Sequence, residues 1–346
     1  MLTIRQFAKA SGYSPATISL VLNNSPAGES IPSSTRKKIF SVARKLGYHP
    51  NRFARSLRSS RSYAVAVIVP DIEDPYCAQI LSGIDDALYG SHYLPVLVDI
   101  HNSRVRYRKY VTELFERRID GVIAVANSLQ LQASMLSSFE EHNIPVIVIG
   151  QEPTSKGMSS VCVDNKEGGR SSIAHLYELG HRRIAIIKGP AKVVDSVHRW
   201  DGMAQFAREA GLPLDKNLVI QLEDTSSSSE AGFTAMNQLL KRKSSFTAVI
   251  AFDDMTAFGA IRALTLNGRR VPEDCSVIGF DDLMAAAYSN PPLTTISQSM
   301  KELGANGVSI LLERTAAKDK KLEEQTKAVR KTLKPLLVVR ESTVRI

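Results

Sequence analysis

Residues 3–23 read TIRQFAKASGYSPATISLVLN and predict two short helices joined by a tight turn. Apolar residues recur at i, i+3 and i+4 in each helix, which gives each of them one buried face. Gly12 suits the turn because glycine adopts positive φ without strain, and Ser14 can cap the second helix with Pro15 at its first position. This pattern is typical of a helix-turn-helix, whose second helix enters the DNA major groove, although a helical pair in any globular core shares it.

Basic charge is concentrated around this stretch. Residues 1–61 contain eleven basic residues and one acidic residue, Glu29, for a net charge of +10. The remaining 285 residues carry 33 basic and 34 acidic side chains, for a net charge of −1. A solvated basic face would explain a scattered excess better than a concentrated one, so the segment predicts a polyanionic partner.

A third helix is predicted from about Ser33, with Ser33 or Ser34 as its cap and Gly47 just after its end. Its apolar stripe, spaced i, i+3, i+4, i+7, consists of Ile39, Val42, Ala43 and Leu46. The stripe can cover the first two helices. The three helices together make a small module of marginal stability.

The next segment, YHPNRFARSLRSSR at residues 48–61, predicts a short basic helix that Asn51 can cap. Such a helix is too short to be stable alone in water, so we expect it to form only with a partner. In a dimer two of these helices could enter a minor groove, where Leu57 would wedge between base steps while the arginines neutralise phosphates. A plain basic linker is the alternative interpretation.

From Tyr63 onward, apolar strand-like runs alternate with amphipathic stretches. The runs are at residues 64–69, 93–100, 121–126, 145–150, 160–163, 183–189, 218–222, 248–252 and 276–280, with a last returning run at 333–339. Runs that are apolar on both faces are typical of buried parallel strands, and their number predicts two doubly wound sheets. The predicted fold is therefore an all-α helix-turn-helix head followed by an α/β core of two parallel-sheet lobes.

The composition fits a cytoplasmic protein of 346 residues. No apolar run is long enough to span a bilayer, and the N-terminus lacks a secretory apolar core. Cys77, Cys162 and Cys275 are far apart and odd in number, so we expect buried thiols rather than a disulfide framework.

Small ligands of doubly wound sheets bind outside the carboxyl ends of the strands. The residues that follow the predicted strands are Asp71, Asp74, Tyr76, Asp99, His101, Asn127, Asp164, Asn165, Asp195, Arg199, Trp200, Asp253, Asp254, Asp281 and Asp282. Carboxylates and amides accept hydrogen bonds from hydroxyls, and aromatic faces pack on sugar rings, so the set favours a polyhydroxylated ligand. For any single one of these residues, helix capping is an equally good explanation.

The order and spacing of these motifs resemble the lac repressor/galactose repressor (LacI/GalR) family of bacterial transcriptional regulators over nearly the whole chain. The motifs include the helix-turn-helix, NRFARSL as a hinge helix, RRIDGVI, AFDDMTAFGAIRAL, RVPEDCSVIGFDD, PPLTTI and the terminal VVRES. The resemblance implies a two-lobed core of periplasmic-binding-protein type. We therefore place a helix-turn-helix domain at residues 1–48, a hinge helix and linker at 49–62, and the effector-binding and dimerisation core at 63–346. The N-lobe should take about 63–163 and 297–328, and the C-lobe about 164–292 and 331–346.

The resemblance also implies site residues. The expected DNA contacts are Thr3, Ser14, Pro15, Ala16, Thr17, Ser19, Leu20, Asn23, Tyr48, Asn51, Arg52, Arg55, Leu57 and Arg58. The expected effector contacts are Asp74, Tyr76, Asp164, Asp195, Arg199, Trp200, Asp253 and Asp281. The chain departs from the family pattern in a longer loop at 26–32, an unusually apolar reading face, Cys77 in place of an aromatic residue, and an altered run after Gly189.

These observations predict a sequence-specific DNA-binding regulator, a repressor that acts as a homodimer on a pseudo-palindromic operator. A small effector would bind between the lobes and act allosterically as inducer or corepressor. The residues predicted to line its pocket favour a carbohydrate. A solute-binding protein shares the two-lobed core but needs export. An enzyme is disfavoured because we find no dinucleotide fingerprint, phosphate-binding loop, nucleophile elbow or metal-ligand spacing, so no catalytic residue, metal or cofactor is expected. Activation instead of repression remains an alternative, since operator position decides the sign.

Overall fold

A computed structural model of the chain describes residues 2–22, 26–48, 61–126, 133–153, 157–223, 228–242, 244–319 and 327–346. Contacts divide the chain into two compact units, Met1–Ser62 and Tyr63–Ile346. No helix among the residues described is both long and apolar enough to span a membrane.

The first unit is a small helical bundle. It contains α1 (Ile4–Ser11), α2 (Pro15–Leu22), the 3₁₀ turn η1 (Pro26–Gly28) and α3 (Ser33–Lys45). The predicted turn is confirmed, because Gly12 adopts φ 73° at the end of α1. The predicted cap of α2 is also confirmed, since the Ser14 hydroxyl accepts a hydrogen bond from the Thr17 amide at 3.1 Å.

The core of this unit consists of fully buried Phe7, Ile18 and Ile39, one from each helix. Two predictions about α3 are wrong. Its N-cap is Pro32, which offers no side-chain hydrogen bond, because Ser33 already lies inside the helix. Leu46 is 41% exposed, since it follows the last helical residue and turns away from the stripe.

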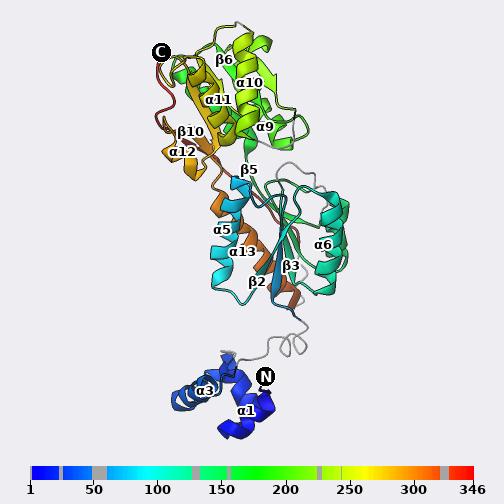
Figure 1. Cartoon of the computed structure of the whole chain (residues 1–346). Coiled ribbons are helices and arrows are strands. Elements are labelled where there is room, and N and C mark those ends of the chain that lie inside the picture. Colours follow the sequence, from blue (N-terminus) through cyan, green and yellow to red (C-terminus); the bar gives the residue numbers. More distant parts are fainter. Residues whose placement is uncertain are drawn as a thin grey trace. The chain divides into compact units, whose positions relative to one another are not determined.

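The first lobe of the second unit is built on a parallel sheet with strand order β11-β5-β4-β3-β1-β2. Helices α5 and α13 cover one face, and α6 and α7 cover the other (Figure 1). Its elements are β1 (Ala64–Val69), α5 (Pro75–Tyr89), β2 (Leu94–Asp99), α6 (Arg104–Glu116), β3 (Gly121–Val125), α7 (Ala133–Glu141), β4 (Val146–Ile149), β5 (Ser159–Val163), α13 (Met300–Asp319) and β11 (Arg330–Leu333).

The second lobe has the strand order β12-β10-β9-β8-β6-β7, with only β12 antiparallel to its neighbour. Helices α10 and α11 pack on one face, and α8 and α9 on the other. Its elements are α8 (Asn165–Glu178), β6 (Ile184–Lys188), α9 (Val194–Glu209), η2 (Lys216–Leu218), β7 (Val219–Gln221), α10 (Ser229–Lys241), β8 (Ala248–Ile250), α11 (Asp254–Leu266), β9 (Ser276–Asp281), α12 (Met284–Tyr288), β10 (Thr294–Ser297) and β12 (Leu336–Val338). The predicted fold class of two doubly wound sheets is confirmed.

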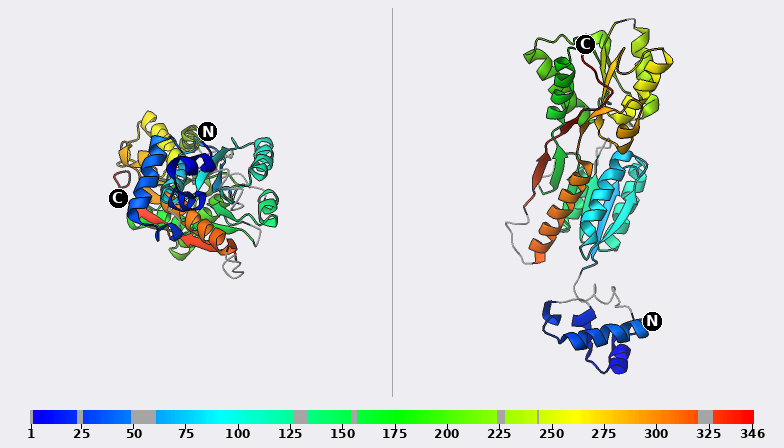
Figure 2. Two further views of the ribbon diagram at one scale, coloured as in Figure 1. Left: turned by 90° about the horizontal axis from the view of Figure 1, so that it is seen from below. Right: turned by 90° about the vertical axis from the view of Figure 1, so that its left-hand side faces the viewer.

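The chain passes between the lobes after β5, between β10 and α13, and between β11 and β12 (Figure 2). The last of these passages corrects the prediction of one returning strand at 333–339. Strand β11 pairs with β5 in the first sheet, whereas β12 pairs with β10 in the second. Pro335 lies in the break, where its missing N–H could not have served a ladder. The expected second lobe, which includes residues 331–333, is wrong at this point, because these residues pair with β5 in the sheet of the first lobe. Strand β10 was not predicted as a strand.

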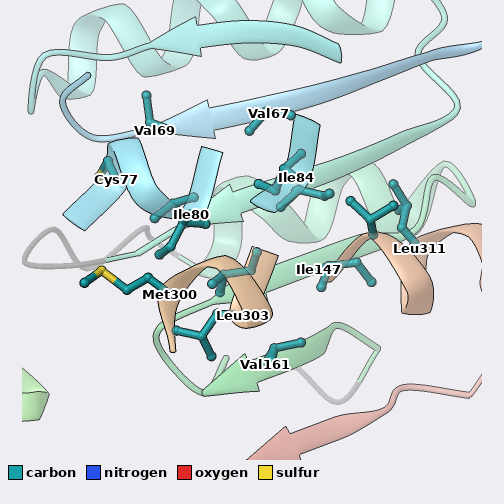
Figure 3. Close-up of a cluster of buried hydrophobic side chains, with 14 of the residues drawn as sticks. Val67, Val69, Cys77, Ile80, Ile84, Ile147, Val161, Met300, Leu303 and Leu311 are labelled. Carbon is teal, nitrogen blue, oxygen red and sulfur yellow. The ribbon is translucent and has the colours of Figure 1, made fainter. Parts of the chain in front are cut away.

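Apolar side chains of α5 and α13 meet on the sheet of the first lobe (Figure 3). Cys77 and Ile80 from α5 and Met300 and Leu303 from α13 belong to this cluster, and each is at most 2% exposed. The prediction of buried free thiols is confirmed for all three cysteines.

Candidate functional site

Helix α2 presents the candidate DNA-reading face of the helical unit. Ile18 and Val21 point into the core, with exposures of 0% and 2%. Pro15 and Ala16 are exposed, and Leu20 is partly exposed. The helix thus has one face committed to packing and another, mostly apolar, face open to a partner.

Several predicted DNA contacts also have structural roles here. Thr3 forms a capping box with Gln6, whose amide donates to the Thr3 hydroxyl at 3.3 Å. Ser14 caps α2, and its hydroxyl lies 2.8 Å from that of Thr17.

Tyr48 is 8% exposed, and its ring stacks on Phe7 with centroids 4.6 Å apart. Ser19 is half-buried on α2. Predicted contacts that lie outside the described residues are Asn23, Asn51, Arg52, Arg55, Leu57 and Arg58.

In the core, three of the predicted effector contacts are helix caps. Asp74 accepts from the Tyr76 amide at 2.9 Å, and Asp164 accepts from the Glu167 amide at 2.9 Å. Asp253, which is 4% exposed, accepts from the amide of the third residue of α11 at 2.8 Å. Asp164 is exposed and lines a surface hollow of 400 Å³ between α8 and α9. The structure therefore supports the capping interpretation for each of them.

Arg199 on α9 is the centre of the remaining group and is only 4% exposed. Its Nε donates to Asn165 Oδ1 at 2.8 Å, and its Nη1 donates to the Phe252 carbonyl at 2.7 Å. Its Nη2 lies 4.0 Å from Asp281 Oδ1, which is an ion pair too long for a hydrogen bond. The guanidinium also stacks on Phe280, 3.5 Å from the ring centroid. Because arginine has five N–H donors, these contacts fix its plane and leave donors for a ligand.

Two carboxylates near Arg199 lie where charge is disfavoured. Burial raises the pKa of Asp281 well above its usual range, and this is opposed by Arg199 and reinforced by Asp253 and Asp254. Burial also raises the pKa of Asp195, again opposed by Arg199. Partly buried carboxyl groups held beside a buried guanidinium are typical of a polar binding site as well as of a structural network.

Tyr76 brings the first lobe into the same group. It lies in the first turn of α5 and is 9% exposed. Burial raises the pKa of its hydroxyl, and the charges of Asp195 and Asp281 raise it further, so the hydroxyl stays protonated. A Cβ at Gly150 would lie 2.6 Å from the Tyr76 hydroxyl, so glycine is needed beside the ring. Tyr76, Asp195, Arg199 and Asp281 thus converge from both lobes.

Trp200 has a different environment from its neighbour Arg199. It packs against the cluster beneath α8 and α9, and the Lys188 ammonium lies 4.3 Å from its ring centroid. Burial lowers the pKa of Lys188. The ring is therefore held by cation–π and apolar contacts.

The residues that hold Arg199 and Asp281 in place are not marked by any of the motifs in the sequence. Phe252 and Phe280 end strand-like runs, a position typical of apolar core residues, yet both rings face the guanidinium. Gln298 donates to Asp281 and had no motif to mark it. An aromatic residue directly before an Asp at a strand end, as in AFDD and GFDD, was the available signal.

The structure also forms a group that the sequence spacing did not predict. Asp71 follows β1, Asp99 ends β2 and His101 comes shortly after it, and their ligand-type atoms lie within 4.8 Å of one another. The group is partly exposed, and its oxygens already serve the turns. Asp99 accepts from the His101 amide at 2.9 Å, and Asp71 accepts from the Glu73 amide at 2.9 Å.

Comparison with known proteins follows the same division of the chain. The profile of bacterial regulatory proteins of the lacI family matches residues 3–51, and that of the periplasmic binding protein-like domain matches residues 173–343. The HTH-type transcriptional regulator DegA of Bacillus subtilis (strain 168) is 34% identical over 343 residues, which cover 99% of this chain and 98% of DegA.

Solved structures align over the same length. The lac repressor dimer bound to operator and the anti-inducer ONPF is 26% identical and superposes with a TM-score of 0.83, covering 99% of both chains. The complex of the transcriptional regulator CelR with cellobiose is 30% identical with a TM-score of 0.72, covering 99% of this chain and 100% of CelR.

Proposed function

The chain belongs to the lacI family of bacterial regulatory proteins, and from this premise we propose that it is a repressor controlled by a small polyhydroxylated effector. It is a DNA-binding transcriptional regulator and not an enzyme. The alternative of a solute-binding protein loses its support, because the relatives that match nearly the whole chain are regulators.

The observation that carries the effector proposal is the convergence of Tyr76, Asp195, Arg199 and Asp281. It joins a buried guanidinium, two partly buried carboxyl groups and a buried phenol. Such a set offers both donors and acceptors to neighbouring hydroxyl groups, which suits a carbohydrate better than an apolar ligand. The cellobiose complex of CelR supports the same ligand class.

We place the DNA contact on the exposed face of α2. Pro15, Ala16 and Leu20 would meet the edges of bases, where apolar side chains favour thymine methyl groups. The net charge of +10 over residues 1–61 would supply the phosphate contacts. Two copies in a homodimer would read the two halves of a pseudo-palindromic operator in the cytoplasm.

Leu57, which lies outside the described residues, is proposed as the wedge at the operator centre. Leu57→Ala should then weaken binding to operator far more than binding to random DNA. Mobility-shift titrations on both DNAs measure this ratio, and equal losses would remove Leu57 from that role.

A thermal-shift screen of the purified protein against cellobiose, ribose, glucose and a set of nucleobases tests the effector proposal. A ligand at about 100 times its Kd adds about 2.7 kcal/mol to folded-state stability, so binding raises Tm. Arg199→Ala should abolish the shift, whereas Arg208→Ala, on the exposed side of α9, should keep it. A shift given only by nucleobases would overturn the carbohydrate proposal.

A further inference from the structure

One apolar side chain of the second lobe lies in the buried core of the first lobe, and a second packs against that core. Leu283, which follows β9, is 3% exposed and belongs to the cluster that contains Tyr76, Cys77 and Met300. Met255, in the first turn of α11, packs against the same cluster. The lobes therefore meet through an apolar contact as well as through the polar group around Arg199. We call Leu283, the buried side chain of this contact, the plug.

The turn that carries Leu283 is held at each of its residues. Asp281 accepts from Gln298, and Asp282 accepts from Arg340. Asp281 and Asp282 adopt φ values of 118° and 59°, which lie in the left-handed region that side chains other than glycine seldom occupy. Such a conformation persists only where surrounding contacts determine it.

Asp254 fixes the end of this turn. It is 0% exposed, and its Oδ2 accepts from the Leu283 amide at 2.8 Å. Its Oδ1 accepts from the Thr295 hydroxyl at 2.6 Å. A Cβ at Gly279 would lie 2.3 Å from that oxygen, so the carboxylate sits directly against the backbone of β9. Asp254 thus ties α11, β9, β10 and the turn together from inside the second lobe.

Asp281 and Leu283 therefore stand two residues apart in one fixed turn. Asp281 belongs to the proposed effector group, and the Leu283 side chain packs in the apolar cluster of the first lobe. Because hydrogen bonds hold Asp281, Asp282 and the Leu283 amide in one turn, we expect a displacement of Asp281 to be transmitted to Leu283.

We propose that the turn Asp281–Asp282–Leu283 is the element that couples effector binding to the angle between the lobes, with Leu283 as the plug and Asp254 as its positioning residue. The proposal rests on the proposed function for the meaning of the effector, but the lobe contact itself is independent of any ligand. It predicts that shortening Leu283 loosens the lobes without disturbing the second-lobe core.

The buried thiols supply an internal reporter. Cys77 lies in the plugged cluster, and Cys275 lies in the second-lobe cluster away from it, both at 0% exposure. Burial raises the pKa of both thiols, so each should react slowly until its surroundings open. The ratio of their alkylation rates separates opening of the lobe contact from global unfolding.

The experiment is a timed iodoacetamide pulse on the ligand-free, full-length protein, with each cysteine quantified by peptide mass spectrometry. Leu283→Ala should raise the Cys77 rate about tenfold while leaving Cys275 unchanged, as expected for easier local opening. Met284→Ala is the matched control, because Met284 is the next residue and is 78% exposed. It should change neither rate.

Asp254→Asn tests the positioning role without removing any atom from the first-lobe cluster. An amide cannot accept on both of its terminal atoms, so one of the two hydrogen bonds is lost. The Cys77 rate should rise, by less than in Leu283→Ala. Binding to an operator selected from random DNA by the wild-type protein should change in both variants, whereas binding to random DNA should not.

Equal acceleration of Cys77 and Cys275 alkylation in Leu283→Ala would show a purely structural role and overturn the proposal. An unchanged Cys77 rate in that variant would also overturn it. Altered Cys77 labelling with unchanged operator binding would overturn the coupling role. Failure of the proposed effector function would appear elsewhere, as absence of any thermal shift with cellobiose, ribose or glucose in the wild-type protein.

Discussion

The helical unit and the two-lobed core place their candidate functional side chains in opposite environments. On α2, Pro15 and Ala16 are exposed, and no charge is buried in the described core of that unit. In the second lobe, Arg199 and Asp253 are each 4% exposed, and burial raises the pKa of Asp195. The candidate DNA-reading side chains on α2 lie outside the core of the helical unit. The candidate effector side chains are themselves part of the buried interior of the two-lobed core.

This difference bears on how each region tolerates change. A side chain on the reading face can be replaced at little cost to folding, because surface substitutions usually change stability by less than about 0.5 kcal/mol. A buried ionic group cannot be replaced singly without leaving a partner charge in low dielectric. Substitutions should therefore separate binding from stability in the helical unit but mix them in the core.

The largest expected effect is on DNA affinity and belongs to the helical unit. Deleting residues 1–62 removes the segment that carries the +10 charge of residues 1–61 and should abolish salt-dependent DNA binding. A protein with 6–10 phosphate contacts loses about 10³–10⁵ in affinity between about 50 and 200 mM salt. Titrations at several salt concentrations measure the slope. If the core alone kept the same slope, the positive charge of residues 1–61 would not be the source of the salt-dependent affinity.

Arg199→Ala should give the next largest effect and belongs to the core. Removing the guanidinium leaves Asn165 Oδ1 and the Phe252 carbonyl without their donor, and each buried acceptor left unsatisfied costs about 1–3 kcal/mol. Urea denaturation measures the loss, with Arg208→Ala as the exposed control on the same helix. A loss no greater than that of the control would show that the Arg199 group behaves like a surface site.

The sequence predicted the helical unit and the number of sheets because both depend on local patterns. Periodicity at i, i+3 and i+4 marks Phe7 and Ile18, and both are fully buried. The break at Pro335 is harder to predict, because Lys334 and Pro335 are compatible with an edge strand, and only the pairing with two different sheets reveals two strands.

The candidate effector group was only partly predictable for a related reason. An Asp after a strand can cap a helix or bind a ligand, and the sequence does not distinguish these roles. Asp74 and Asp253 cap helices, whereas Asp281 faces Arg199. The partners that decide, such as Gln298, lie far away along the chain and carry no motif.

Gly28→Ala tests whether the helical unit is as tolerant as its exposed face suggests. A Cβ on Gly28 would lie 2.7 Å from the Leu20 carbonyl oxygen, so η1 or α2 would have to shift. Overpacking of this kind costs about 1–3 kcal/mol and should also weaken operator binding by displacing Leu20. Gly90→Ala is the control, because a Cβ there meets no atom within 4 Å. Thermal unfolding and mobility shifts measure both effects, and equal behaviour of the two variants would contradict the tight contact.

The smallest expected effect is a pH dependence confined to the core. His181 is 0% exposed, with Nδ1 2.8 Å from the Thr247 hydroxyl and Nε2 3.1 Å from the Val344 carbonyl. Burial lowers its pKa in the folded state, so its contribution to stability is present above the unfolded pKa of about 6.5 and is lost as pH falls below that value.

The contribution of His181 to core stability should therefore fall between about pH 7 and pH 5. Burial raises the pKa of Asp254 to about 7, which acts with the opposite sign, since that contribution is lost as pH rises through this value. Thermal unfolding across this range should give a weaker acid dependence for His181→Gln than for wild type. Residues 1–48 contain no histidine, so the transition of the helical unit should not share the effect. An identical pH profile in the variant would exclude His181 as the source and would leave His175, whose pKa burial also lowers, as the group to replace next.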